Sequence, residues 1–169
     1  YSQFVIKKSQ LRIKSYELEN EKRKFRIKKK KMRKNMKITD EQAMEEAVKE
    51  AYSGINAGDG GPFGSVIVKD GKIIGRGHNR VIKNQDPTCH GEIEAIRDAC
   101  KNIKTFDLSG STLYTTAQPC PMCLGAILWA NIKLVFQGCS IEDTEKIGFR
   151  DSKFYDFLNG KNRILETKE

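Results

Sequence analysis

The sequence predicts a layered α/β domain, and three features of the 169-residue chain indicate it. Apolar residues recur with helical spacing after Thr39, and two short runs rich in Val and Ile flank Asp70 and Gly71. Further helix and strand patterns then alternate along the chain. Such alternation favours helices packed on a sheet that contains a parallel crossover. The length fits one domain.

The first helix is predicted to begin at residues 39–42, "TDEQ", which form a capping box. Its expected apolar face comprises Ala43, Met44, Ala47, Val48, Ala51, Tyr52 and Ile55. The glycines of "NAGDGGPFG" end this helix. The next segment, "SVIVKDGKIIGRG", is typical of two strands that form a hairpin turning at Asp70 and Gly71.

The remaining elements alternate. A second helix is expected from residue 90 to about 102, a third strand at "STLYTT", a third helix over residues 121–130 and a fourth strand at "KLVFQG". His90 and Cys120 therefore both lie where a helix begins. Helix dipoles and free amides would converge there on one cleft and favour anionic groups.

His90, Glu92, Cys120 and Cys123 form the pattern that carries chemistry: H-x-E, then 26 residues, then P-C-x-x-C. Two cysteines three residues apart on the first turn of a helix point their sulfurs the same way. Imidazole and thiolates suit zinc. Three ligands leave one position for water, and a carboxylate that is not a ligand can relay protons. This donor set indicates an enzyme.

Two other interpretations of the pattern remain. A redox cysteine pair would not need the histidine. A structural zinc site would need a fourth ligand, for which His78, Cys89, Cys100 and Cys139 are the candidates. Cys89 adjoins His90, which is poor geometry for one tetrahedral site, and Cys100 lies roughly 15 Å further along the helix.

These motifs resemble the zinc-dependent cytidine and nucleobase deaminases, whose signature is H-x-E followed by P-C-x-x-C. The resemblance runs from about Thr39 to about Asn159 and includes "GGPFGSVIVKDGKIIGRGHN" and "CLGAILWA". It implies a three-layer α/β/α fold with a central mixed sheet flanked by helices, in a domain at residues 36–169. Among the branches, "INAGDGGPFGSVIVKDG", "GAILWA" and "IGFRDSKFY" are most similar to bacterial guanine deaminases, and tRNA adenosine deaminases are the nearest rival.

The resemblance implies roles for individual residues. One Zn²⁺ per chain would be held by His90, Cys120 and Cys123, with Glu92 as the proton shuttle and a free nucleobase as the substrate. The implied base contacts are Asn79 in "GHNR", Phe63 in "GPFGS", Trp129, Asp151 in "FRDS", which would read the edge of guanine, and the backbone amide of Cys120. Gly91 stands where Ala is usual and would widen the space beside the base.

The reaction implied is hydrolysis of guanine to xanthine and ammonia. Deamination of tRNA adenosine, or of cytosine or a nucleoside, is the alternative. A further possibility is a catalytically inactive zinc-binding module tethered to nucleic acid by a basic tail. Glu92 counts against that module, because an inactive relative does not need a proton shuttle.

The C-terminus departs from the guanine deaminase pattern. That branch continues into a segment that crosses to the partner of a homodimer and closes the pocket, and nothing near Glu169 matches it. Either the sequence is cut short or another aromatic residue, Phe154 or Tyr155, serves as the lid. The expected oligomer is a homodimer.

Positive charge is concentrated in residues 1–35. They contain 14 of the 31 Lys and Arg residues but only 3 of the 22 Asp and Glu residues, so residues 36–169 carry 17 basic and 19 acidic side chains. A protein that grips a tRNA backbone needs basic side chains on its folded surface. The distribution therefore favours a small-molecule substrate, with nucleic acid bound through the tail if at all.

Residues 1–35 are expected to form a disordered extension, because blocks of like charge repel one another. An arm for nucleic acid or acidic membranes and an organelle presequence are alternatives. Met36 directly precedes the domain pattern and is a candidate native start, which would make the tail an upstream in-frame extension.

The chain has no run of 18 apolar residues, no secretory signal and an odd number of cysteines, five. These features predict a cytoplasmic protein without a membrane span or a disulfide framework.

Overall fold

The computed structural model describes residues 19–26, 37–166 and 168. The chain divides between Lys37 and Ile38 into two units, which are considered separately. Residues 19–26 of the first unit are helical, with Lys24 Nζ 3.1 Å from Glu21 Oε1. The sequence predicted no regular structure there. The remainder of the predicted disordered extension lies outside the described residues.

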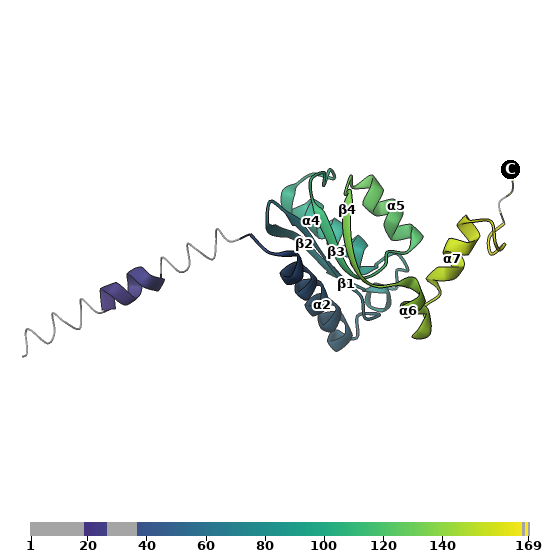
Figure 1. The fold of residues 1–169 in the computed structure, drawn as a ribbon. Coiled ribbons are helices and arrows are strands. Elements are labelled where there is room, and N and C mark those ends of the chain that lie inside the picture. Colours follow the sequence, from purple (N-terminus) through teal and green to yellow (C-terminus); the bar gives the residue numbers. More distant parts are fainter. Residues whose placement is uncertain (1–18, 27–36, 167, 169) are drawn as a thin grey trace, which may run out of the picture. The chain divides into compact units, whose positions relative to one another are not determined.

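The second unit is built on a four-stranded mixed sheet with strand order β2-β1-β3-β4 (Figure 1). The strands are β1 (Gly64–Lys69), β2 (Lys72–His78), β3 (Thr112–Ala117) and β4 (Leu134–Cys139). Strand β1 pairs antiparallel with both β2 and β3, whereas β3 and β4 are parallel. Both the mixed sheet and the parallel crossover between β3 and β4 confirm the prediction.

The hairpin between β1 and β2 turns at the predicted residues. Asp70 and Gly71 have φ angles of 52° and 75°, so both lie in the left-handed region. Two consecutive residues of this kind match the right-handed twist of the flanking strands, and Asp-Gly is favoured for this reason.

Helices cover both faces of the sheet, which gives the three predicted layers (Figure 1). Helix α2 (Asp40–Ala57) packs on one face, and α4 (Gly91–Ile103) and α5 (Pro121–Trp129) pack on the other. The first core consists of Ala43, Ala47, Val66, Val68 and Tyr114. The second consists of Ile67, Ala95, Ala99, Leu108, Leu113, Ile127, Ala130 and Ile132.

Helix α2 begins with the predicted capping box, because Thr39 Oγ1 accepts a hydrogen bond from Gln42 N. Its buried face is narrower than predicted: Val48, Tyr52 and Ile55 are 39%, 62% and 45% exposed. The buried positions are all small, namely Ala43, Ala47, Ala51 and Gly54. Small side chains let the helix lie close to the strands, so a thin stripe of its surface makes the contact.

Helix α4 also approaches the sheet closely. A Cβ atom at Gly75 would lie 2.4 Å from Ala95 O, and one at Gly77 would lie 2.3 Å from Ala95 N. Both distances are far below van der Waals contact. The backbone of α4 therefore rests directly on β2, which fixes where the first turn of α4 projects.

Three further helices were not predicted: α3 (Val81–Asn84), α6 (Ile141–Lys146) and α7 (Asp151–Leu158). Helix α7 is joined to the sheet region by a hydrogen bond from Tyr155 OH to Pro119 O, at 2.6 Å. Just before α7, the ring of Phe149 meets that of Phe63 edge to face, with centroids 4.6 Å apart. No helix in the described ranges is long and apolar enough to cross a membrane.

Candidate metal centre and active site

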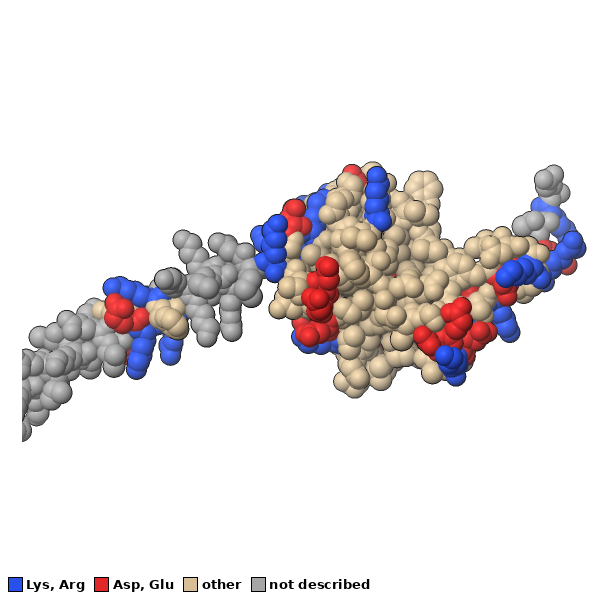
Figure 2. Space-filling model, in the orientation of Figure 1, with Lys and Arg blue, Asp and Glu red and all other residues tan. Residues whose placement is uncertain are grey.

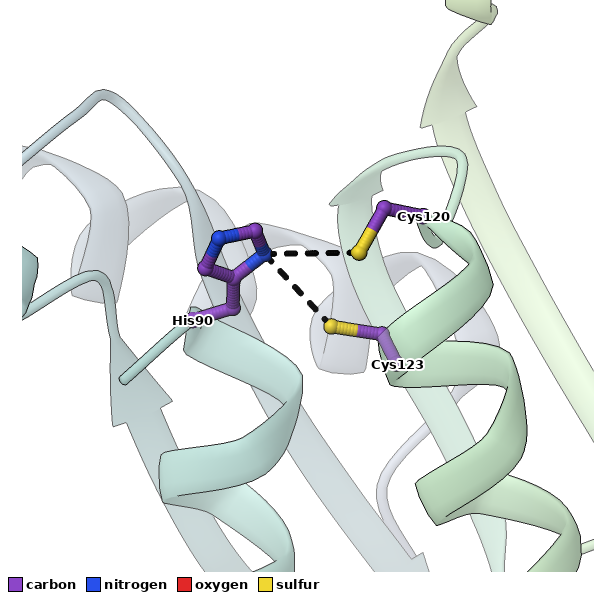
Figure 3. Close-up of side chains that lie close together, drawn as sticks. All are labelled: His90, Cys120 and Cys123. Atoms are coloured by element: carbon purple, nitrogen blue, oxygen red, sulfur yellow. Dashed lines mark hydrogen bonds between the residues drawn. The ribbon is translucent and has the colours of Figure 1, made fainter. Parts of the chain in front are cut away.

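His90, Cys120 and Cys123 come together at the first turns of α4 and α5 (Figure 3). His90 occupies the N-cap of α4 and Cys120 the N-cap of α5, both with extended backbone. Pro121 follows at the first position of α5, where its fixed φ favours helix formation and no amide hydrogen is needed. Cys123 lies one turn on and is fully buried.

The geometry of the three side chains fits zinc. His90 Nδ1 lies 3.6 Å from the sulfur of Cys120 and 3.6 Å from that of Cys123. All three donor atoms lie within 4.8 Å of one another. Zinc bonds of about 2.1 Å to nitrogen and 2.3 Å to sulfur, at tetrahedral angles, place these atoms about 3.6 Å apart.

The two thiols affect each other's ionisation. A hydrogen bond from Cys123 lowers the pKa of Cys120 to about 4, whereas the same contact, together with burial, raises the pKa of Cys123. The pair thus holds one negative charge by itself. A divalent metal supplies the positive charge that lets both sulfurs ionise.

None of the four candidate fourth ligands joins this group. His78 pairs instead with Asp59 and Glu50. The sulfur of Cys89 contacts Asn84, Asp86 and Arg97. Cys100 packs from α4 against the second core, and Cys139 lies exposed on β4. All five cysteines are free thiols. Within the described ranges the site therefore has three protein ligands, which leaves a position for water or substrate.

Glu92 lies in the first turn of α4 and is only 6% exposed. Burial, followed by the charge of Cys120, raises the pKa of its carboxyl group above the usual range. The side chain lines the same cavity as His90 and Cys120. A proton acceptor is thus held beside the metal ligands.

A cavity of about 350 Å³ opens at this site. Its walls come from the end of β2, the first turns of α4 and α5, the end of β3 and the segment that enters α7. The lining residues are Phe63, Asn79, Val81, Pro87, His90, Glu92, Ala117, Gln118, Cys120, Gly148, Phe149, Arg150, Asp151 and Phe154.

Asn79 directly follows β2, is 6% exposed and lines the cavity. Its Oδ1 accepts a hydrogen bond from Val81 N at 3.1 Å, which starts the short helix α3. Its backbone amide donates to Phe63 O at 2.9 Å. The Oδ1 atom of Asn79 therefore stabilises a turn, and its Nδ2 group can donate a hydrogen bond to a molecule in the cavity.

Asp151 is the first residue of α7 and also lines the cavity. Burial raises the pKa of its carboxyl group, and the negative charge of Cys120 adds to this effect. Phe154, one turn further along, reaches the same cavity. Of the two predicted lid residues, Phe154 thus lines the site, whereas Tyr155 anchors α7 through Pro119.

Two predicted substrate contacts lie elsewhere. Trp129 is 86% exposed at the far end of α5, where it lines a different surface hollow with Phe106. Its position eight residues after the start of α5 carries it away from the first turn. Gly91 does not line the cavity either: a Cβ there would approach Phe63 O at 3.2 Å, so this glycine makes room for packing on β1.

The structure also adds residues that the sequence interpretation missed. Phe149 and Arg150 line the cavity, and Arg150 lies 5.8 Å from the centroid of the Phe154 ring. Residues 150 to 158 were not recognised as a helix. The spacing of Asp151, Phe154 and Tyr155 along one helical face was the signal that could have indicated it.

Comparisons with known proteins agree with this geometry. Residues 37–139 match a family described as the cytidine and deoxycytidylate deaminase zinc-binding region. A guanine deaminase of Bacillus subtilis is 51% identical over 118 residues, covering 70% of this chain and 76% of that protein. A tRNA-specific adenosine deaminase of Buchnera aphidicola is 42% identical over 121 residues, covering 72% and 80%.

Solved structures show the same relationship. The X-ray structure of Bacillus subtilis guanine deaminase superposes with a TM-score of 0.74 at 45% identity, over 78% of this chain and 85% of that one. A guanine deaminase from Nitrosomonas europaea superposes with a TM-score of 0.64 at 31% identity, over 68% and 66%. Since the matched family region spans both metal-binding segments, this chain belongs to the cytidine and deoxycytidylate deaminase zinc-binding family, and zinc is its cofactor.

Proposed function

We propose that this chain hydrolyses guanine to xanthine and ammonia. One observation carries the proposal: a single cavity joins the metal ligands and Glu92 to Asn79 and Asp151, two polar groups that can read a purine edge. A guanine deaminase that is 51% identical over 118 residues supports the choice of base.

The metal supplies one part of the chemistry. When bound by His90, Cys120 and Cys123, zinc acts as a Lewis acid and lowers the pKa of a bound water toward ~7. Glu92 takes up a proton from the attacking water and delivers it to a ring nitrogen. It then takes up the remaining proton of the added hydroxyl group and delivers it to the departing amine, which leaves as ammonia. Its burial raises its pKa above the usual range, which suits a carboxyl group that must both accept and return protons.

The other cavity residues hold the base. The carboxylate of Asp151 accepts hydrogen bonds from N–H groups on the guanine edge, and Asn79 Nδ2 donates to an acceptor on the ring. Phe63, Phe149 and Phe154 provide apolar walls for a flat heterocycle. A purine without matching groups would leave Asp151 and Asn79 unpaired in a desolvated site, so it should be rejected.

Deamination of tRNA adenosine is the alternative, since tRNA-specific adenosine deaminases are also similar to this chain. Residues 36–169 carry 17 basic and 19 acidic side chains, and acidic residues gather over α2 and α6 on the face shown in Figure 2. Phosphate contacts dominate binding to a polynucleotide. The charge balance therefore favours a free base.

Ammonia release from a panel of substrates tests the proposal. Guanine, adenine, cytosine, cytidine and an anticodon stem-loop with adenosine would each be incubated with zinc-loaded protein. Guanine should react fastest, and Glu92→Gln should abolish the reaction while one zinc per chain remains bound. Deamination of the stem-loop with no reaction on guanine would refute the choice of substrate, and an active Glu92→Gln variant would refute the shuttle.

We also propose a homodimer that forms through α5 and β4. Helix α5 is apolar on all sides, yet Leu124, Leu128 and Trp129 are 36%, 72% and 86% exposed. Such a helix is normally covered. Strand β4 is an edge strand of the sheet, and the surface around α5 carries few charges in Figure 2.

Sedimentation analysis tests the dimer. Leu128→Asp should convert the dimer to a monomer, because it places a charge in the proposed apolar contact. Tyr52→Asp is the matched control, since Tyr52 is 62% exposed on α2, at the opposite face of the sheet. A wild-type monomer, or equal effects of both variants, would contradict this interface.

A cytoplasmic location, in the metabolism of purine bases, is supported by five free cysteines in this family of zinc-dependent deaminases. Any binding to nucleic acid should come from residues 1–35. A chain that begins at residue 36 should then lose it, and the binding of the longer chain should weaken steeply as salt increases.

A further inference from the structure

His78, the residue before Asn79, is the centre of a buried charged cluster that the mechanism above does not use. Its ring is 7% exposed. Nε2 lies 2.9 Å from Asp59 Oδ2, and Nδ1 lies 3.3 Å from Glu50 Oε2. Each ring nitrogen thus faces a carboxylate oxygen.

Asp59 also lies close to two basic side chains. Lys83 Nζ lies 3.0 Å and Arg80 Nε 3.8 Å from the same carboxylate oxygen. The hydrogen bonds from His78 and Lys83 lower the pKa of Asp59. Arg80 Nε also donates a hydrogen bond to His78 Nε2 at 3.3 Å. The Nη1 group of Arg80 donates to Oε2 of Glu94, in α4, at 3.3 Å.

These contacts tie the loop after α2 to the end of β2, to α3 and to α4. Buried charges are costly to leave unpaired, so the members of such a cluster hold one another in a single arrangement. Asn79, which lines the cavity, stands in the sequence between two members of this cluster, His78 and Arg80.

Close packing connects the position of the cluster to the position of Asn79. Asp59 holds His78, and the next residue in the loop, Gly60, is so close to Asn79 that a Cβ there would lie 2.1 Å from Asn79 Oδ1. Gly54 leaves equally little space, because its Cβ would lie 2.8 Å from the His78 ring. The adjacent loop residues Asp59 and Gly60 therefore contact His78, which ends β2, and Asn79, which follows it.

We infer that His78 and Asp59 are positioning residues that hold the Asn79 amide in its orientation toward the substrate. The inference rests on the proposed role of Asn79 in binding the base. Asn79 already uses its Oδ1 group and its backbone amide within the protein. Any shift of the loop or of His78 moves the free Nδ2 donor relative to the ring.

A double-mutant cycle on kcat/KM tests the inference in the full-length, zinc-loaded protein. Asp59→Asn keeps the shape of the side chain and removes its charge. Asn79→Ala removes the side-chain amide that Asp59 is proposed to position. Asp59→Asn alone should lower kcat/KM by about tenfold or more, mainly through KM, since a misplacement of about 1 Å costs up to 10²-fold. In the Asn79→Ala background the same change should have an effect below about twofold.

His78→Gln provides a second cycle. It should also lower kcat/KM in the wild-type background and have little effect in the Asn79→Ala background. Asp107→Asn is the matched control: this aspartate also accepts hydrogen bonds, from Ser109 N and Asn131 Nδ2, but it lies beyond the end of α4 that is remote from the site. It should leave kcat/KM unchanged in both backgrounds. Zinc content should stay at one per chain in every variant.

Additive effects of Asp59→Asn and Asn79→Ala would overturn the inference, because they would mean that the cluster only stabilises the fold. If His78→Gln does not fold, the cycle with Asp59→Asn decides the matter. If the wild-type protein ignores guanine, the proposed substrate is wrong, and the same cycle is measured on the base that the panel identifies. The two failures are thus distinguishable.

Discussion

Gly77→Ala should displace the helix that carries His90 and Glu92. The added Cβ would lie 2.3 Å from Ala95 N and 2.5 Å from Gly91 O, both backbone atoms of α4. Ordinary contact begins near 3.4 Å, so α4 has to retreat by about 1 Å from β2. No flexible side chain can absorb the clash.

The magnitude follows from this displacement. Overpacking of a core by one methyl group costs about 1–3 kcal/mol, and a domain of this size loses about 4 °C of melting temperature per kcal/mol. Metal sites tolerate shifts of only about 0.2 Å in ligand distances. Moving His90 by about 1 Å relative to Cys120 and Cys123 should therefore weaken zinc binding as well as catalysis.

Competition with a zinc chelator, thermal melting and ammonia release provide the measurements. Gly125→Ala is the matched control, since a Cβ on this helical glycine meets nothing within 4 Å in one chain, and sedimentation analysis checks that the dimer proposed through α5 stays intact. It should leave zinc affinity unchanged and stabilise the fold by up to ~1 kcal/mol. A Gly77→Ala protein with wild-type zinc affinity and melting temperature would refute the reasoning.

Four further predictions follow from the same coordinates. Cys123→Ala should reduce bound zinc below about half an equivalent in metal analysis, because it removes one of three ligands; full retention would contradict the site. Asp151→Ala should lower guanine turnover by tenfold or more with zinc still bound, and unchanged turnover would remove its role in reading the base. Burial and the hydrogen bond to Asp40 raise the pKa of Tyr114 to about 12, so this residue stabilises the fold below pH ~10 and loses that effect as pH rises toward 12; the difference in stability between wild type and Tyr114→Phe should shrink over that range in denaturant titrations. Removing residues 1–35 should change the melting temperature by less than ten degrees, since residues 38–169 form a compact unit; a larger drop would mean that the extension packs on it.

The sequence alone was sufficient for the metal centre, because its determinants are local. His90 and Glu92 share one helix start, and Cys120 and Cys123 share another. Helix periodicity, a proline at the first position and the ligand chemistry of zinc together specify which side chains point the same way. The four strands, their hairpin turn and the helices at α2, α4 and α5 follow from patterns of the same short range.

Only the tertiary structure decided which other residues reach the site. Trp129 lies on the same helix as Cys123 but at its exposed far end, whereas Phe149 and Arg150 line the cavity and were not predicted from the sequence. The position of α4 depends on two glycines of β2, and that of Asn79 on a charged cluster assembled from α2, β2, α3 and α4. Local propensity carries no information about such contacts, because they depend on how closely elements distant in sequence approach one another in the folded chain.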